Sequence, residues 1–258
     1  MVGSLEPWII TIYKSFYLTT FQQPEIMLRE MTMTSTKIII PVGEKERVSA
    51  VITVPERYDE RKKTGIIISH GAGNDMNNSM IVFLAEGLTE AGYLTLRFNF
   101  PYREKGRKKP DPQHELVSTW QGVYRYLKEK SEFKPEKIIA AGKSMGGRVA
   151  AQMSADGLLT PERLVFFGYP LHAPGKKDHP RDAHLYQITI PMLFFAGTRD
   201  PFCDMAALKN VLCRLDTSWD LETIDGGDHS FNVPKSAETS ELEVYERILN
   251  KTVEWLGH

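Results

Sequence analysis

The chain has 258 residues, of which 41% are hydrophobic and 25% are charged, and its formal net charge is −1. These values are typical of one soluble globular domain, and a charge near zero argues against nucleic acid as a partner, because phosphate contacts need a basic face. The two cysteines, Cys203 and Cys213, are separated by a helical pattern, so reduced thiols and a cytoplasmic location are expected.

Residues 1–33 are expected to form an extension outside the folded domain, which is predicted over residues 34–258. The apolar run at residues 8–13 is too short to span a bilayer, so a membrane partner is not expected. The segment also lacks the basic start and the small-residue cleavage site of a secretory signal. An added helix and a partner-binding segment are the alternatives for this extension.

From residue 37 the chain alternates between strand and helix patterns. A predicted hairpin, 37–42 with 47–54, precedes six strand patterns that are interpreted as fully apolar. Those strands are expected at 65–69, 94–99, 137–141, 164–168, 192–197 and 219–224, and helices at 79–91, 114–130, 145–155, 205–215 and 242–255. Fully apolar strands that alternate with helices predict an α/β fold, with a mostly parallel eight-stranded sheet covered by helices on both faces. Ligand sites in such sheets lie beyond the carboxyl ends of the strands.

Residues 142–147, Gly-Lys-Ser-Met-Gly-Gly, join the predicted strand at 137–141 to the predicted helix at 145–155. A serine between two glycines in this context is typical of a nucleophile elbow, which holds the serine hydroxyl clear on a strained turn. Two rival motifs fail on spacing, since a P-loop needs a glycine at Lys137 and a dinucleotide fingerprint needs one at Met76. Ser144 is therefore the expected nucleophile, and no cofactor is expected.

Asp200 follows the strand at 192–197 and His229 follows the strand at 219–224, so both are expected at the same sheet edge as Ser144. The chain order Ser, Asp, His is that of α/β hydrolases. A turn or cap role for Asp200 and an exposed loop position for His229 are the alternatives. Rival carboxylates nearby are Asp204, Asp225 and Asp228. Asp228 is the best of these, although adjacent side chains usually diverge, which places it badly for orienting His229.

Negative charge on a tetrahedral acyl intermediate needs preorganised donors, each worth about 3 kcal/mol. The expected donors are the backbone N–H groups of Met145, which follows the nucleophile, and of Ala72, in the His-Gly-x-Gly loop after the strand at 65–69. His70 in that loop is expected to brace it with hydrogen bonds rather than to act in catalysis.

The segment between Gly168 and Met192 holds only 23 residues, too few for a large lid. Tyr169 and His172 are expected either to line the acyl pocket or to pack the turn. No metal is expected, because His172, His179 and His184 fit no usual zinc spacing.

Arg103 begins a loop rich in positive charge, which continues with Lys105, Arg107, Lys108 and Lys109. This loop is either a solvated segment or a site that attracts anionic substrates such as phosphate-bearing acyl thioesters. Under the second interpretation Arg103 is a substrate-binding residue.

Six blocks of sequence resemble the dienelactone-hydrolase-like α/β hydrolases. More closely, they resemble a small family that includes a testis-expressed hydrolase-like protein and a subunit of a histone acetyltransferase complex. The blocks are residues 69–73, 98–103, 142–148, 168–172, 197–202 and 227–231. The resemblance implies the α/β-hydrolase fold, with Ser144, Asp200 and His229 as the catalytic triad. Dienelactone hydrolase itself uses a cysteine nucleophile, so its substrate is not implied for this chain.

These residues together predict a serine hydrolase that cleaves a carboxylic ester or thioester through an acyl-enzyme on Ser144, with amides as the second choice. The expected partner is a small-molecule acyl substrate, whose acyl group and leaving group stay open, as does the oligomeric state. The alternative is a hydrolase-like interaction protein or complex subunit with little or no catalysis. The chromatin-complex member of the resembling family and the N-terminal extension motivate that alternative.

Overall fold

The computed structural model describes residues 33–43, 46–56, 58 and 63–257. The extension predicted for residues 1–33 therefore lies, except for Met33, outside the described residues. The description begins with a strand at Met33.

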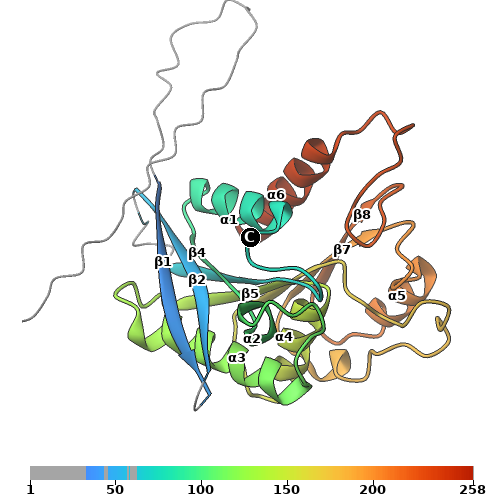
Figure 1. Cartoon of the computed structure of the whole chain (residues 1–258). Coiled ribbons are helices and arrows are strands. Elements are labelled where there is room, and N and C mark those ends of the chain that lie inside the picture. The colour runs from blue at the N-terminus through green and yellow to red at the C-terminus, as the bar shows by residue number, and fades with distance from the viewer. Residues whose placement is uncertain (1–32, 44–45, 57, 59–62, 258) are drawn as a thin grey trace, which may run out of the picture.

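Apolar runs of the middle of the chain form the centre of one eight-stranded sheet, in the order β1-β2-β4-β3-β5-β6-β7-β8 (Figure 1). The strands are β1 (Met33–Val42), β2 (Glu46–Pro55), β3 (Thr64–Ser69), β4 (Leu94–Phe98), β5 (Lys137–Lys143), β6 (Arg163–Phe167), β7 (Met192–Gly197) and β8 (Trp219–Ile224). Every residue of β3 and of β7 is buried, as expected for strands covered on both faces.

The sheet is mixed rather than purely parallel. Strand β2 runs antiparallel to both β1 and β4, whereas the five remaining neighbouring pairs are parallel. Because β3, β5, β6, β7 and β8 are mutually parallel, their carboxyl ends meet at one edge. The prediction of a mostly parallel eight-stranded sheet is confirmed.

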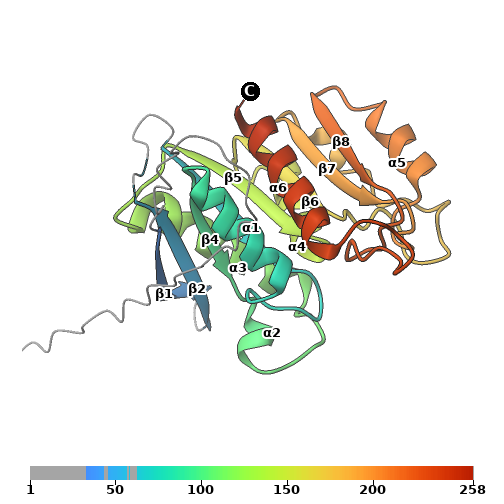
Figure 2. The ribbon, with the colours of Figure 1, turned by 90° about the horizontal axis from the view of Figure 1, so that it is seen from above.

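Helices cover both faces of the sheet (Figures 1 and 2). They are α1 (Ser79–Glu90), α2 (Pro101–Glu104), α3 (Gln113–Arg125), α4 (Met145–Ala155), α5 (Met205–Leu212) and α6 (Glu241–Gly257), with a π-helical turn η1 (Tyr126–Lys130) and a 3-10 turn η2 (Leu185–Gln187). Helices α1 and α6 lie side by side over one face, where Leu84 and Ile248 join one buried cluster. Helices α3, α4 and α5 cover the other face, where Trp120, Val149 and Leu208 join the second.

Several elements differ from the sequence-based prediction. Strand β1 begins at Met33 rather than at residue 37, because its polar first residues pair with the end of β2, as in Met33 with Pro55. The helix predicted over 114–130 changes to a π-helical turn after Arg125. Helix α2 was not predicted; Pro101 stands at its first turn, where a missing N–H costs nothing.

The prediction that the last six strands are fully apolar is wrong for β8. This edge strand is mostly half-buried, and its Asp220 and Glu222 form ion pairs with Lys251 and Arg247 of α6. Charged side chains on an edge strand discourage pairing with another chain.

The segment between β6 and β7 contains only the short turn η2, so no large lid domain is inserted there. Within the described residues, no helix is both long enough and apolar enough to cross a membrane.

Candidate active site

Ser144 stands on the turn between β5 and α4 with a backbone conformation that non-glycine residues rarely adopt, at φ 50° and ψ −115°. The glycines around it allow backbone to pass at close range. A Cβ on Gly146 would lie 2.6 Å from the carbonyl oxygen of His70, and one on Gly147 would lie 2.7 Å from that of Gly142. The sequence therefore folds here into the strained turn expected of a nucleophile elbow.

The structure brings Ser144, His229 and Asp200 together, although they are far apart in sequence. The His229 Nε2 atom lies 2.7 Å from Ser144 Oγ, and His229 Nδ1 lies 2.7 Å from Asp200 Oδ2. A carboxylate can only accept, so His229 carries a proton on Nδ1. Nε2 of the neutral ring is then free to accept the hydroxyl proton of Ser144, as a general base must.

The Asp200 carboxylate has no exposed side-chain surface. Its Oδ1 atom accepts from the backbone N–H of Phe202 at 2.7 Å, while its Oδ2 accepts from His229. Both oxygens of this buried group thus have donors, which a buried charge requires. The ring of Phe202 packs at 4.5 Å from the His229 ring, measured between centroids.

The rival carboxylates have other contacts. Asp228 accepts from the backbone N–H groups of Ser230 and Asn232 and closes the loop that carries His229.

The other two carboxylates also have partners away from the imidazole. Asp204 caps α5 by accepting from the backbone N–H of Ala207, and Asp225 accepts from the Thr198 hydroxyl. Asp200 is the carboxylate that hydrogen-bonds to the imidazole.

The loop after β3, which holds Ala72, lies beside the nucleophile. A Cβ on Gly71 would lie 3.3 Å from Ser144 Cβ. In the turns and loops of the described chain, neither Ala72 nor Met145 donates its backbone N–H to a carbonyl. Met145 is also the first residue of α4. The backbone N–H groups of a first helical turn have no intrahelical acceptor and point out of the N-terminal end of the helix.

His70 is fully buried and braces this loop with both ring nitrogens. Its Nε2 accepts from the N–H of Phe100 at 3.2 Å, so Nδ1 carries the proton and donates to the Gly71 carbonyl at 2.8 Å. Burial lowers the pKa of His70 to about 4, so the ring is neutral near pH 7. The bracing role expected for His70 is confirmed.

Tyr169 and His172 are both buried and both have partners inside the fold. The Tyr169 hydroxyl lies 2.7 Å from Nε2 of His184. His172 Nε2 accepts from the backbone N–H of Asp204 at 2.8 Å, and the backbone N–H of His172 donates to the carbonyl of Phe202. His172 therefore joins the segment after β6 to the loop that holds Asp200, and the described contacts of both residues are those of packing groups.

Arg103 is paired rather than free. It lies 3.3 Å from Asp75 and donates to the backbone carbonyl of Arg107. Lys105 pairs with Glu46 and Arg107 with Asp111, so much of the positive charge of this loop is neutralised locally. Lys108 and Lys109 are exposed.

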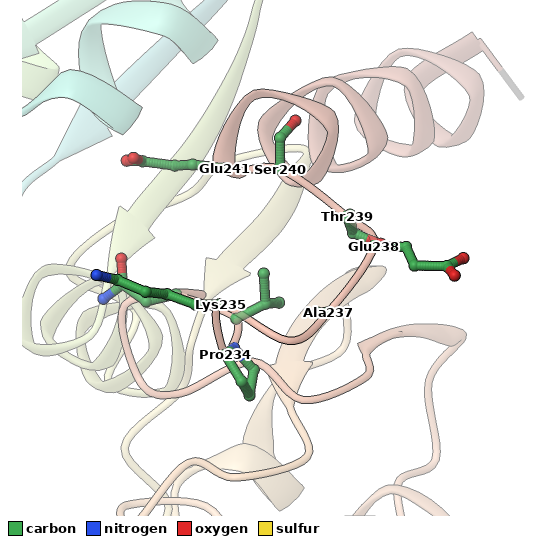
Figure 3. Close-up of a pocket in the computed structure, with 9 residues that line it drawn as sticks. Pro234, Lys235, Ala237, Glu238, Thr239, Ser240 and Glu241 are labelled. Carbon is green, nitrogen blue, oxygen red and sulfur yellow. The ribbon is translucent and has the colours of Figure 1, made fainter.

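A pocket of about 420 Å³ lies immediately after the histidine loop, between it and α6 (Figure 3). Nine residues between Asn232 and Glu241 line it, and the side chains of Lys235 and Glu238 extend in opposite directions. None of the residues that the sequence marks as substrate-binding lines this pocket.

Within the described ranges, no group of three or more His, Cys, Asp or Glu side chains is arranged to hold a metal ion. Cys203 is buried and Cys213 is exposed, and both are free thiols.

Two residues of the site were missed from the sequence. Lys143 is buried at the end of β5 and donates from Nζ to the backbone carbonyl of His229. Phe202 covers the His229 ring. A signal existed for Lys143, because a lysine that ends a buried apolar strand and precedes the nucleophile must find a partner.

Several solved structures share the fold of this chain. A dienelactone hydrolase from Anabaena variabilis superposes with a TM-score of 0.68 at 21% identity, over 88% of this chain and 98% of that one. A lidless serine hydrolase from Xanthomonas campestris gives a TM-score of 0.66 at 18% identity, over 87% of this chain and 96% of that one. Est1E from Butyrivibrio proteoclasticus, with ferulic acid bound, gives a TM-score of 0.67 at 19% identity, over 86% of this chain and 100% of that one.

Two curated proteins of Mycobacterium tuberculosis, both named "Putative phosphoribosyl transferase", are 26% identical over 194 residues. The match covers 74% of this chain but only 41% of those proteins. Residues 62–257 match the family described as "Alpha/beta hydrolase domain", which is most of the chain. The chain therefore belongs to the α/β hydrolase family.

Proposed function

We propose that the protein is a serine hydrolase that cleaves a carboxylic ester or thioester through an acyl-enzyme on Ser144. The observation that carries the proposal is the pair of 2.7 Å contacts that link Ser144 to His229 and His229 to Asp200. A strained serine, a base within hydrogen-bond distance and a buried acid are the parts that nucleophilic acyl transfer needs.

In the proposed mechanism, His229 Nε2 takes the Ser144 proton while Oγ attacks the acyl carbon. The C–O or C–S bond of the tetrahedral intermediate then breaks, and His229 returns the proton to the departing alcohol or thiol. Water, deprotonated by His229, then attacks the acyl carbon. The bond between that carbon and Ser144 Oγ breaks, His229 returns the proton to Oγ, and the carboxylic acid leaves. Asp200 holds the imidazole in the required tautomer and stabilises its positive charge during each transfer.

The proposed oxyanion hole consists of the N–H groups of Ala72 and Met145. Support comes from the position of the 70–73 loop beside Ser144 and from the helix that begins at Met145. Two such donors lower the barrier by about 3 kcal/mol each when they are aimed at the developing charge. The bracing of this loop by His70 keeps the donors in place before the reaction, so no reorganisation is needed.

Esters and thioesters come before amides because their leaving groups depart more easily. The finer relationship to the testis-expressed and acetyltransferase-subunit family stays a prediction from the six sequence blocks, as does a cytoplasmic location. Phosphoribosyl transfer is not proposed, because the match to the two mycobacterial proteins spans less than half of their length.

The proposal is tested with a fluorophosphonate probe and a panel of p-nitrophenyl esters and acyl thioesters of increasing chain length. We expect covalent labelling of Ser144 in the wild type, found by peptide mass spectrometry, and no labelling of Ser144→Ala. Turnover of at least one ester or thioester should disappear in the same variant. A folded wild type that neither reacts with the probe nor turns over any substrate would favour the interaction-protein alternative.

A further inference from the structure

Lys143 occupies an unusual place for a lysine. It is the last residue of β5, directly before Ser144, and only 7% of its surface is exposed. Burial is the main cause that lowers the pKa of its ammonium to about 8, against the opposing effects of Asp200 and Asp228. Because a buried ammonium is costly unless it has acceptors, the contacts of Nζ indicate why the lysine is there.

The Nζ atom of Lys143 donates to the backbone carbonyl of His229. The same ammonium lies 5.4 Å from the centre of the Phe231 ring, so it contacts the histidine loop at two points. A Cβ on Gly168 would lie 3.0 Å from Nζ and 3.2 Å from the His229 oxygen. The glycine therefore leaves the space in which this contact forms.

The loop that carries His229 needs such an anchor. Phe231 has φ 67°, a strained conformation for a non-glycine residue, and Asp228 folds the loop back on itself through Ser230 and Asn232. Those hydrogen bonds hold the loop together but do not fix its place relative to β5. Asp200 fixes the imidazole from one side only, through Nδ1.

We propose that Lys143 is a positioning residue, which sets the distance between the Ser144 hydroxyl and the His229 imidazole by anchoring the His229 backbone to the end of β5. The nucleophile and the anchor of its base are then adjacent residues, Lys143 at the end of β5 and Ser144 on the turn that follows it. The effect on rate rests on the proposed hydrolase function, whereas the anchoring itself does not.

The test uses Lys143→Met, which keeps the apolar stem and removes the donor. The chain offers a matched control in Arg163, at the opposite end of the sheet. Arg163 also donates to a backbone carbonyl, that of Trp255, and lies 5.0 Å from the Trp255 ring. Arg163→Met thus removes the same kind of contact without touching the site.

We expect the rate constant for Ser144 labelling at saturating fluorophosphonate to fall about 10- to 100-fold in Lys143→Met, because small displacements of a catalytic base have effects of this size. The half-saturating probe concentration should change little. Arg163→Met should be labelled at the wild-type rate, even if it lowers the melting temperature by as much as Lys143→Met does. Equal labelling rates in Lys143→Met and wild type, or equal slowing in both variants, would overturn the proposal.

Amide hydrogen exchange separates this inference from the proposed function. Residues 228–232 should exchange faster in Lys143→Met than in the wild type and in Arg163→Met. If the wild type is not labelled at all, the hydrolase function fails, and faster exchange in Lys143→Met alone still supports the anchor. Unchanged exchange in this segment overturns it whatever the labelling shows.

Discussion

The ring of Phe202 packs at 4.5 Å from the imidazole of His229, while the backbone N–H of the same residue donates to the carboxylate that holds that imidazole. One residue thus contacts both Asp200 and His229. The backbone contribution is independent of the side chain, so the two roles can be separated by substitution.

Phe202→Leu should slow Ser144 labelling by about 2- to 10-fold, since an aromatic pair contributes about 0.5–1.5 kcal/mol beyond buried area. The Asp200 hydrogen bond from the backbone remains. Phe133→Leu, which removes the partner of Tyr58 in an edge-to-face pair away from the site, is the control and should label normally. A Phe202→Leu protein that labels as fast as the wild type would show that the ring does not restrain the imidazole.

Asp200→Asn should reduce turnover by about 10³-fold or more, because an amide in this place can favour the wrong imidazole tautomer. Asp228→Asn should lose far less, since the Asn oxygen still accepts from Ser230 and Asn232. Steady-state rates on one ester measure both variants. A larger loss in Asp228→Asn than in Asp200→Asn would contradict the assigned acid.

The basic loop after β4 predicts a salt dependence. If Lys108, Lys109 and their neighbours attract anionic substrates, kcat/KM for a phosphate-bearing acyl thioester should fall about threefold or more between low and high salt, because screening shortens the reach of exposed charges. A neutral thioester of equal acyl length should not respond. The double variant Lys108→Gln and Lys109→Gln should remove the difference, and equal responses of both substrates would reject the hypothesis.

His70 predicts a loss of stability in acid. Burial lowers its pKa from 6.5 to about 4 in the folded protein, so between these values the unfolded chain binds more protons than the folded one. The free energy of unfolding should therefore fall as pH drops from about 6.5 towards 4, with His70 accounting for up to about 3 kcal/mol.

Urea unfolding across this pH range measures the effect. His70→Gln keeps an acceptor for Phe100 and does not titrate, so its curve should be flatter than that of the wild type. The exposed His179 provides the control, because His179→Gln should leave the slope unchanged. Parallel curves for His70→Gln and wild type would show that His70 is not held neutral by burial.

The sheet, its main crossover helices and the three residues that meet at its edge could be predicted from the amino-acid sequence. Apolar runs at strand spacing identify buried strands, and the chain order of Ser144, Asp200 and His229 places each after a strand of the same parallel group. A strained glycine-flanked turn and a buried strand each depend on a few consecutive residues, so a local sequence pattern can predict them. The fully apolar character predicted for the edge strand β8 is wrong. An edge strand pairs with a neighbour on one side only and is less buried, so it tolerates charged residues such as Asp220 and Glu222.

The hydrogen bond between Asp200 and His229, and the contacts that hold the site in place, become visible only in the folded structure. Asp228 adjoins His229 in sequence, yet Asp200, 29 positions away, makes the contact. The anchor from Lys143 to the His229 backbone spans 86 positions, and Tyr169 and His172 turned out to be engaged with packing partners. Contacts between loops depend on the relative positions of the strand ends. The packed sheet sets these positions, and no local sequence pattern predicts them.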